Sequence, residues 1–263
     1  MSRYYRSFLE ESGAVYTART TAFATATGIT DTTILGALNT FDLGLISNSL
    51  DTKMKAVYPF VGGTATTQKY NFMDARDLDV AFRLQFFGGG TFSNNGYQPN
   101  GTNAYANTFL IANSLSQNSV HLSYYSRTNN DLLCFEIGSE SNTSSLCWIS
   151  RLTDTGYVYA NTTTGDTVYP NTNSNGLYML DRTSSSVNKL FRNGNIIVNG
   201  TKTSVTPNPY AIYIGALNSS NTPISFSNRE GTFASIGDGL SDTEASTLYT
   251  LTQAMQTTLG RQV

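Results

Sequence analysis

Charged residues are scarce in this sequence. Of its 263 residues, 13% are Asp, Glu, Lys or Arg, about half of the roughly 25% found in an average soluble domain. The 16 basic and 18 acidic residues give a formal net charge of −2, and the basic residues form no cluster. A protein that binds nucleic acid needs Lys and Arg to displace counterions from phosphates. The composition therefore excludes nucleic acid as a partner.

Histidine and cysteine are also rare. His121 is the one imidazole available to a Ser-His-Asp triad, and no nucleophile-elbow glycine pattern accompanies a serine. Neither a second His nor a Cys pair at zinc spacing is present to complete a metal site. Asp74, Asp77 and Asp79 form an acidic cluster, but turn-forming residues before a strand explain it as well as calcium does. We therefore predict no catalytic residue, cofactor or metal site.

Long apolar runs are absent. No stretch approaches the roughly 18 apolar residues that would span a bilayer. Residues 1–6 open the chain, and the apolar run of a secretory signal does not follow them. We therefore expect no membrane span and no export by the usual route, so that the protein is made and kept in a cytoplasm before any assembly.

Uncharged polar and aromatic residues are abundant. Apolar residues make up 39% of the chain and aromatic residues 12%, enough for a substantial core. Thr, Tyr and Phe favour strands, and from Gly63 to about residue 238 short strand-like runs are separated by turns rich in Gly, Asn and Ser. Asn193-Gly194 between two such runs indicates a two-residue hairpin. This pattern predicts an all-β fold, an antiparallel sandwich or barrel.

Three segments depart from the strand pattern. Residues 1–30 are rich in Ala and Thr without a clear period, and we expect an extended arm that a partner orders. Residues 31–50 begin with Asp31 as a helix cap and repeat apolar side chains at the helical period. Residues 241–259 begin with the capping box Ser241-Asp242-Thr243-Glu244, which predicts a second helix.

The two cysteines lie in a predicted hairpin. Residues 131–138 and 143–151 read as its strands, and residues 139–142 read as its turn. Folding the chain about that turn places Cys134 opposite Cys147, close enough for a disulfide. A reduced pair is the usual state in a protein made in a cytoplasm. We favour the reduced pair and keep the disulfide as the alternative.

The C-terminal half carries motifs of a known fold family. The hairpin at Asn193-Gly194, the strand at 212–216 and the closing helix from Leu240 resemble the matching parts of concanavalin A-like lectin/glucanase (laminin-G-like) jelly rolls. The resemblance implies an antiparallel β-sandwich with an N-terminal arm and helix and a C-terminal helix. The chain departs from the family at residues 231–238, where such domains often carry an Asp-rich strand.

Longer stretches resemble virion proteins of tailed bacteriophages, particularly those that infect Bacteroidota. These stretches are residues 53–63, 77–83, 99–106 and 233–263. The resemblance implies a virion location, on the capsid or the tail. It assigns residues 1–50, the arm and amphipathic helix, to contact with other virion proteins or to homo-oligomerisation. Residues 51–263 then form the jelly-roll domain, closed by the helix at 241–259.

Three residues are candidates for contact with a ligand. Jelly-roll glycosidases use Glu-x-Asp-x-Glu on one strand, but here Gly138 replaces the Asp, so we expect Glu136 at a solvated strand end rather than in catalysis. Trp148 is a candidate platform for a sugar ring, although the predicted hairpin places it among core residues. Tyr97 is a candidate exposed aromatic contact in the Gly- and Asn-rich loop at 88–103.

The sequence favours a non-enzymatic virion structural protein that displays a lectin-like domain on the particle, as capsid decoration or as part of a fibre. The first alternative is a receptor adhesin of a tail or head fibre that binds a host or mucosal glycan. The less favoured alternative is a glucanase-type glycosidase, whose activity would depend on Glu136.

Overall fold

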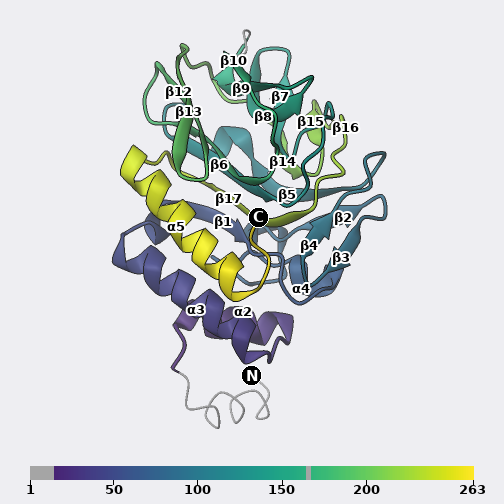
Figure 1. The fold of residues 1–263 in the computed structure, drawn as a ribbon, viewed down its shortest axis with the longest axis vertical. Coiled ribbons are helices and arrows are strands. Elements are labelled where there is room, and N and C mark those ends of the chain that lie inside the picture. The colour runs from purple at the N-terminus through teal and green to yellow at the C-terminus, as the bar shows by residue number, and fades with distance from the viewer. Residues whose placement is uncertain (1–14, 164–166) are drawn as a thin grey trace.

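Two β-sheets stack face to face in the computed structural model, which describes residues 15–163 and 167–263 (Figure 1). The sheet that lies next to the helices, here called the inner sheet, has eight strands. They follow the order β13-β12-β11-β6-β17-β4-β3, and β1 also pairs with β17. Their bounds are β1 (Met54–Tyr58), β3 (Thr91–Ser93), β4 (Gly96–Gln98), β6 (Val120–Ser126), β11 (Gly176–Arg182), β12 (Val187–Arg192), β13 (Asn195–Thr201) and β17 (Gly231–Gly237).

The second sheet, here called the outer sheet, has nine strands in the order β10-β9-β8-β7-β14-β5-β2, with the hairpin β15–β16 attached to β7. Their bounds are β2 (Gln85–Phe87), β5 (Tyr105–Ile111), β7 (Ile137–Ser141), β8 (Ser144–Leu152), β9 (Thr155–Thr162), β10 (Thr167–Pro170), β14 (Ala211–Ile214), β15 (Leu217–Ser219) and β16 (Thr222–Ile224). The β15–β7 pair is parallel, whereas the central pairs of both sheets are antiparallel. The predicted all-β antiparallel sandwich is therefore confirmed.

The main core fills the space between the two sheets. Leu122 and Leu180 of the inner sheet meet Ile137, Trp148 and Ile214 of the outer sheet, and all five side chains are fully buried. Because side chains alternate along a strand, the residues on either side of these point to the opposite face of their sheet. The residues that point into the main core therefore determine which residues of each sheet point to its opposite face.

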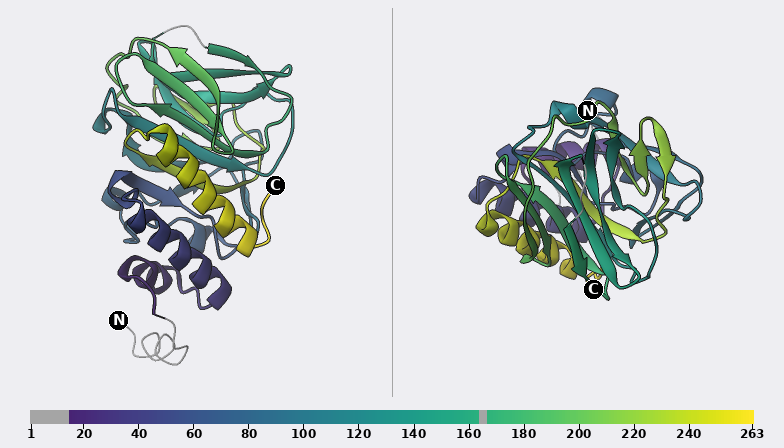
Figure 2. Two further views of the ribbon diagram at one scale, coloured as in Figure 1. Left: turned by 60° about the vertical axis from the view of Figure 1, so that its left-hand side comes forward. Right: turned by 90° about the horizontal axis from the view of Figure 1, so that it is seen from above.

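Three helices cover the other face of the inner sheet (Figures 1 and 2). They are α2 (Ala18–Thr27), α3 (Thr32–Ser47) and α5 (Asp242–Thr258). Phe41 of α3 packs edge-on against Phe233 of β17, with 5.6 Å between the ring centroids, in a second core between helices and sheet. Every residue of β6, β11 and β17 is buried, because these strands are covered on both faces.

Short elements connect the layers. They are the helix α4 (Ala65–Gln68) and the 3₁₀ turns η1 (Asp51–Lys53), η2 (Asp79–Ala81) and η3 (Ala112–Ser114). Over residues 15–163 and 167–263, no helix combines the length and the apolar character needed to cross a membrane.

Both predicted helices are present. Asp31 caps α3 by accepting hydrogen bonds from the backbone N–H groups of Thr33 and Ile34, at 2.8 and 3.1 Å. Ser241 and Glu244 form the predicted capping box of α5. The sequence therefore located these helix starts correctly, because each depends on local hydrogen bonds that a few neighbouring residues specify.

The extended arm predicted over residues 1–30 is wrong for Ala18–Thr27, which form α2. Thr17 caps this helix, and Phe23 and Ala24 are buried in the second core. Alanine has the highest helix propensity, and the packing of these two residues supplies the stability that an amphipathic stripe would otherwise give. Residues 1–14 of the predicted arm lie outside the described residues.

The two predicted hairpins have different outcomes. Asn193-Gly194 joins β12 to β13, and both residues have positive φ angles, 51° and 73°, as the predicted two-residue turn requires. The cysteine hairpin is real, but its turn lies at residues 142–143 rather than 139–142. Moving a turn by two residues moves every cross-strand partner by four, so Cys147 lies opposite Gly138 and not Cys134. Both cysteines are buried and unbonded.

Candidate functional site

Tyr97 is fully buried, so the prediction of an exposed ring is wrong. It belongs to β4, and its side chain lies in the main core. Its ring centroid is 5.0 Å from that of Phe86, 5.2 Å from that of Phe92 and 6.1 Å from that of Phe60. The Gly- and Asn-rich residues around it form tight strand connections rather than an open loop, and Tyr97 has no face left for a ligand.

Trp148 is fully buried in the main core, where the predicted hairpin pattern placed it. Its neighbour across the sheet is Val158 of β9. Leu133, which the sequence placed on the same face, is 50% exposed, because the hairpin register is shifted. The indole ring is therefore not a sugar-binding platform in this structure.

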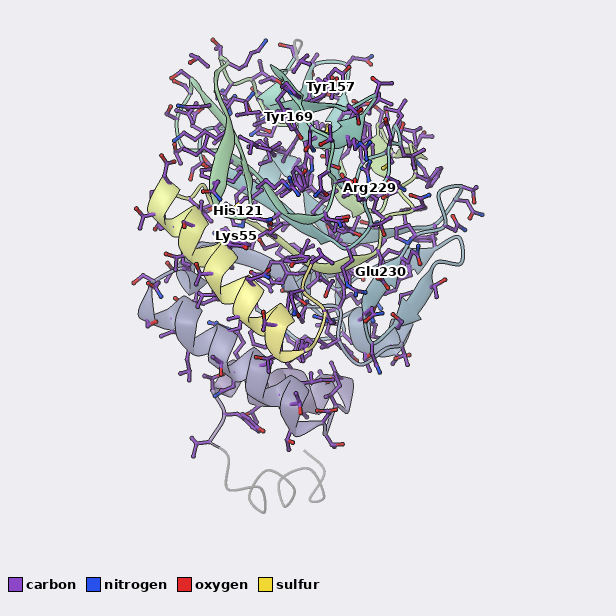
Figure 3. All side chains as sticks on the ribbon, viewed as in Figure 1. Lys55, His121, Tyr157, Tyr169, Arg229 and Glu230 are labelled. Carbon is purple, nitrogen blue, oxygen red and sulfur yellow. The ribbon has the colours of Figure 1, made fainter. Side chains whose placement is uncertain are left out.

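Glu136 is also buried, at 1% exposure, so the prediction of a solvated strand end is wrong. Its Oε1 accepts hydrogen bonds from Nη1 of Arg229 and from the hydroxyl of Ser150, both at 2.6 Å. Arg229, which Figure 3 labels, donates its remaining N–H groups to Asn130 and to further backbone carbonyls. Burial lowers the pKa of Arg229, but the Glu136 carboxylate outweighs it and the pKa is raised overall. Glu136 serves as a counter-ion inside the sandwich.

The carboxylate pair of a retaining glycosidase is missing from the strand that follows Glu136. Gly138 occupies the central position of the motif, and Glu140 pairs with Ser145 across β7 and β8. A glycosidase acid must reach the substrate oxygen, whereas Glu136 is enclosed and neutralised by Arg229. The motif therefore supplies Glu136, whose carboxylate is already paired with Arg229, instead of a cooperating pair of carboxylates.

His121 lies on β6 beside α5 (Figure 3) and is fully buried. Its Nδ1 lies 2.7 Å from the carbonyl oxygen of Asp238, which can only accept, so Nδ1 carries the proton. Nε2 then accepts from the hydroxyl of Ser235 at 3.0 Å, and Ser235 accepts from Ser123 at 2.6 Å. Burial lowers the pKa of His121 to about 4. This contact between a serine and a histidine resembles a catalytic dyad. Both side chains are fully buried, so a substrate cannot reach them.

The acidic cluster is neutralised by neighbouring cations. Asp74 pairs with Arg76 at 2.5 Å, Asp77 with Lys69 at 2.5 Å, and Asp79 with Arg83 at 2.8 Å. In the described part of the chain, no three His, Cys, Asp or Glu side chains lie close enough to hold a metal ion. These ion pairs favour the turn-forming interpretation of the cluster over calcium binding.

A row of aromatic rings crosses the outer sheet on the face away from the core. Ala106, Ile212 and Ile214 point into the core, so alternation turns the aromatic residues beside them outward. The rings of Phe87 and Tyr105 stack at 4.9 Å, and those of Tyr105 and Tyr213 lie 4.7 Å apart. Phe226 adjoins Tyr105 at 6.3 Å. We call these four residues, Phe87, Tyr105, Tyr213 and Phe226, the aromatic row.

The aromatic row combines apolar surface with polar tips. Phe87, at the sheet edge, is 37% exposed, whereas Tyr213 near the centre is 8% exposed. Burial raises the pKa of Tyr105 and of Tyr213, so both hydroxyls are protonated at neutral pH. Among residues 15–163 and 167–263, no partner hydrogen bonds to either hydroxyl. The row therefore has two donors that remain available to a ligand or to water.

Gly138 lies next to the aromatic row and places no side chain beside it. It pairs with Tyr213 on one side and with Cys147 on the other. A Cβ at this position would come within 2.5 Å of the Cβ of Cys147. Beyond it, Tyr157 and Tyr159 of β9 pack on a smaller apolar cluster around Ile149. The outward face of the outer sheet thus carries aromatic residues from β2 to β9.

Sequence reasoning did not identify the aromatic row. Phe87, Tyr105 and Tyr213 come from three strands that are far apart in the chain, and strand order decides that they meet. One local signal was available, because Ile212 and Ile214 flank Tyr213 in an alternating pattern that turns its ring away from the core.

No protein-family model and no curated protein matches this chain. Solved structures match at the level of the fold. A mutant of Trypanosoma rangeli sialidase with trans-sialidase activity aligns with a TM-score of 0.53 and 12% identity, over 84% of this chain and 39% of the sialidase chain. The Trypanosoma rangeli sialidase in complex with sialic acid aligns with a TM-score of 0.51 and 12% identity, over 74% of this chain and 32% of the other.

Domain 4 of an extracellular arabinanase from Geobacillus stearothermophilus, in complex with arabinotriose, has a TM-score of 0.44 and 13% identity. This match covers 74% of the present chain and 98% of that domain. The chain spans about a third of the length of the two sialidase chains. At such low identity the sialidase matches establish the fold alone, a β-sandwich of the jelly-roll type.

Proposed function

We propose that this protein is a non-enzymatic display domain that binds a glycan through the aromatic row. The observation that carries the proposal is the position of the row. The inner sheet is covered on both faces, but in the part of the chain that the structure describes neither a sheet nor a helix is stacked on the outward face of the outer sheet (Figure 2). Aromatic rings pack against the C–H groups of a sugar, and tyrosine hydroxyls bond to its hydroxyls.

The chemistry of the row fits an uncharged or weakly charged polar ligand. Phe87 supplies an exposed ring at the sheet edge, and Tyr105 and Tyr213 supply hydroxyl groups that have no hydrogen-bond partner among the described residues. A sialidase that shares the fold is described in complex with sialic acid. A glycan is therefore the first class of ligand to test.

The absence of enzymatic activity is part of the proposal. Its support is the burial of the two groups best suited to acid–base chemistry, His121 and Glu136, each of which is engaged by protein partners. We expect the protein to release no product from β-glucans or sialosides. Turnover of either class of substrate by the unmutated protein would contradict this part of the proposal.

We further propose that the domain is carried on the particle of a tailed bacteriophage, as capsid decoration or as part of a tail or head fibre. Its support is the sequence resemblance over residues 53–63, 77–83, 99–106 and 233–263. The described chain begins beside α2, on the far side of the inner sheet from the outer sheet (Figure 2). Attachment through this end would leave the aromatic row facing away from the particle.

A glycan array probed with a multivalent form of the protein tests the binding proposal. We expect Tyr105→Ala and Phe87→Ala to weaken binding to the selected glycan by at least about tenfold, as for residues at the centre of a binding surface. Tyr249→Ala is the matched control, because Tyr249 lies on α5 and packs against the second core. The control is expected to bind as the unmutated protein does.

Two results would overturn the proposal. The first is no binding above background to any glycan at high avidity, and the second is binding that both row variants retain. Thermal unfolding of each variant verifies that a loss of binding is not a loss of folding. The particle assignment has a separate test, since mass spectrometry of purified particles is expected to detect the protein, and its absence from them would refute that assignment.

A further inference from the structure

The exposed side of α3 and α5, here called the helical face, carries no charge along most of its length. From Ala245 to Gly260 the sequence has no Asp, Glu, Lys or Arg. The one acidic residue within α3, Asp42, is fully buried and pairs with Arg19. The two helices lie side by side at the surface of the molecule (Figure 2). A soluble helix normally carries charge on its solvent side, so this face is unusual.

The threonines of α5 make the helical face more apolar than its sequence suggests. Thr250, Thr257 and Thr258 are exposed, and each donates its hydroxyl to the carbonyl four residues earlier, at 2.9–3.1 Å. A hydroxyl that is turned back onto its own helix leaves the γ-methyl group facing outward. The face therefore presents methyl groups together with Ala254 and Leu251.

A ridge and a groove lie next to each other on this face. Leu43 is 51% exposed on the outward side of α3. Beside it, Leu251 of α5 reaches over Gly44, where a Cβ would come within 2.3 Å of the leucine side chain. Between the helices, a groove of about 560 Å³ is lined by Asn48 and Leu251, by Ser and Thr side chains of α5, and at one end by Asp242, which pairs with Lys189 at 2.5 Å. The exposed side chain of Leu43 therefore lies next to a groove that is large enough to hold another leucine side chain.

We propose that the helical face binds a second copy of the same chain about a twofold axis. In a twofold dimer the same patch serves on both subunits, so a ridge next to a groove is self-complementary and each contact is made twice. In this dimer, Leu43 of one copy inserts into the groove beside Leu251 of the other copy. This proposal is independent of glycan binding.

Charge supports a copy of this chain as the occupant. The charge of Asp242 in the groove is balanced by Lys189, and the rest of the face is uncharged, so it attracts neither an acidic nor a basic partner and does not repel its own copy. The net charge of −2 also leaves little long-range repulsion between two molecules. Two helices of 16 and 17 residues, at about 1.5 Å per residue and about 9 Å apart, form a plate of roughly 25 by 20 Å. This is below the roughly 800 Å² per partner of a standard interface, so we expect a reversible dimer.

Sedimentation velocity across a concentration series tests the proposal on the full chain. We expect the unmutated protein to shift from monomer to dimer as its concentration rises. Leu43→Glu introduces two like charges into the interface and is expected to weaken association by at least about tenfold. Val80→Glu is the matched control, because Val80 is 74% exposed on η2, outside the helical face, and the substitution changes the net charge equally.

A mixing experiment then tests the arrangement of the two copies. Thr250 lines the groove that receives Leu43, so Thr250→Lys mixed with Leu43→Glu is expected to form a mixed dimer more strongly than either variant forms its own. A protein that stays monomeric at every concentration would overturn the proposal. A dimer that Leu43→Glu leaves intact, or an assembly of another stoichiometry, would overturn it as well.

Discussion

Asp181 lies directly opposite His121 across strands β11 and β6, yet both side chains hydrogen bond to the segment before α5 instead of to each other. His121 donates to the carbonyl of Asp238, and Asp181 accepts from the backbone N–H of Leu240 at 2.8 Å. Ser119 accepts from Gly239 between them at 2.9 Å. Three side chains of the inner sheet region thus fix the three residues that lead into the capping box of α5.

Asp181 makes the stability of the protein depend on pH. Burial is the main cause that raises its pKa from 3.8 to about 7, so folding favours the protonated form. This contribution is complete below about pH 4 and is lost as the pH rises through about 7. We expect Asp181→Asn, which stays neutral, to gain up to about 4 kcal/mol in free energy of unfolding relative to the unmutated protein over that interval.

Urea denaturation at about pH 5 and about pH 8 measures this difference. The amide oxygen of Asn keeps the acceptor for Leu240, so the loss of that hydrogen bond does not obscure the result. His121 acts in the opposite direction, because burial lowers its pKa to about 4 and its contribution is lost as the pH falls from about 6.5 towards that value. A difference between the two proteins that does not vary with pH would contradict the raised pKa of Asp181.

The ion pair between Glu136 and Arg229 is expected to contribute strongly to the stability of the fold. Glu136→Gln removes the negative charge and leaves the fully buried cation of Arg229 without a counter-ion, which costs about 3–5 kcal/mol of unfolding free energy. Asp79→Asn is the matched control, because its pair with Arg83 lies at the surface and is expected to contribute at most about 1 kcal/mol. Equal losses in the two variants, measured by urea denaturation, would refute this prediction.

Both thiols are expected to be unreactive in the folded protein. Burial raises the pKa of Cys134 to about 12 and that of Cys147 well above its usual value, so the reactive thiolate is almost absent. A maleimide reagent is expected to label neither residue at neutral pH and to label both after unfolding. Ser114→Cys places a thiol at an exposed position and serves as the positive control. Rapid labelling of Cys134 or Cys147 in the native state would contradict the prediction.

Local features were predictable from the sequence, and long-range features were not. The turn at Asn193-Gly194 and the caps at Asp31 and Ser241 depend on a few adjacent residues, so their patterns specify the structure. Glu136 finds its partner 93 residues away at Arg229, and no local pattern indicates such a contact. The prediction of a solvated glutamate failed for this reason.

The aromatic row was hidden for the same physical reason. Its rings at 87, 105 and 213 become neighbours only when β2, β5 and β14 pair, and strand order is a property of the whole sheet. Tyr97 gave the opposite error, because its Gly- and Asn-rich surroundings indicate a loop while its ring fills the main core. At Tyr97 the composition of the neighbouring residues therefore predicted neither the strand nor the burial of the ring.

The burial of β6, β11 and β17 on both faces couples the two cores of the molecule. Leu122 of β6 belongs to the main core and Tyr125 of the same strand to the second core, so one strand is shared by both. If the helices detached, the inner sheet would expose an apolar face to water, and the main core would lose the rigid wall against which the outer sheet packs. The helices and the sandwich are thus expected to melt in one cooperative transition, and removing either α2 and α3 or α5 from the chain is expected to leave an unstable sandwich.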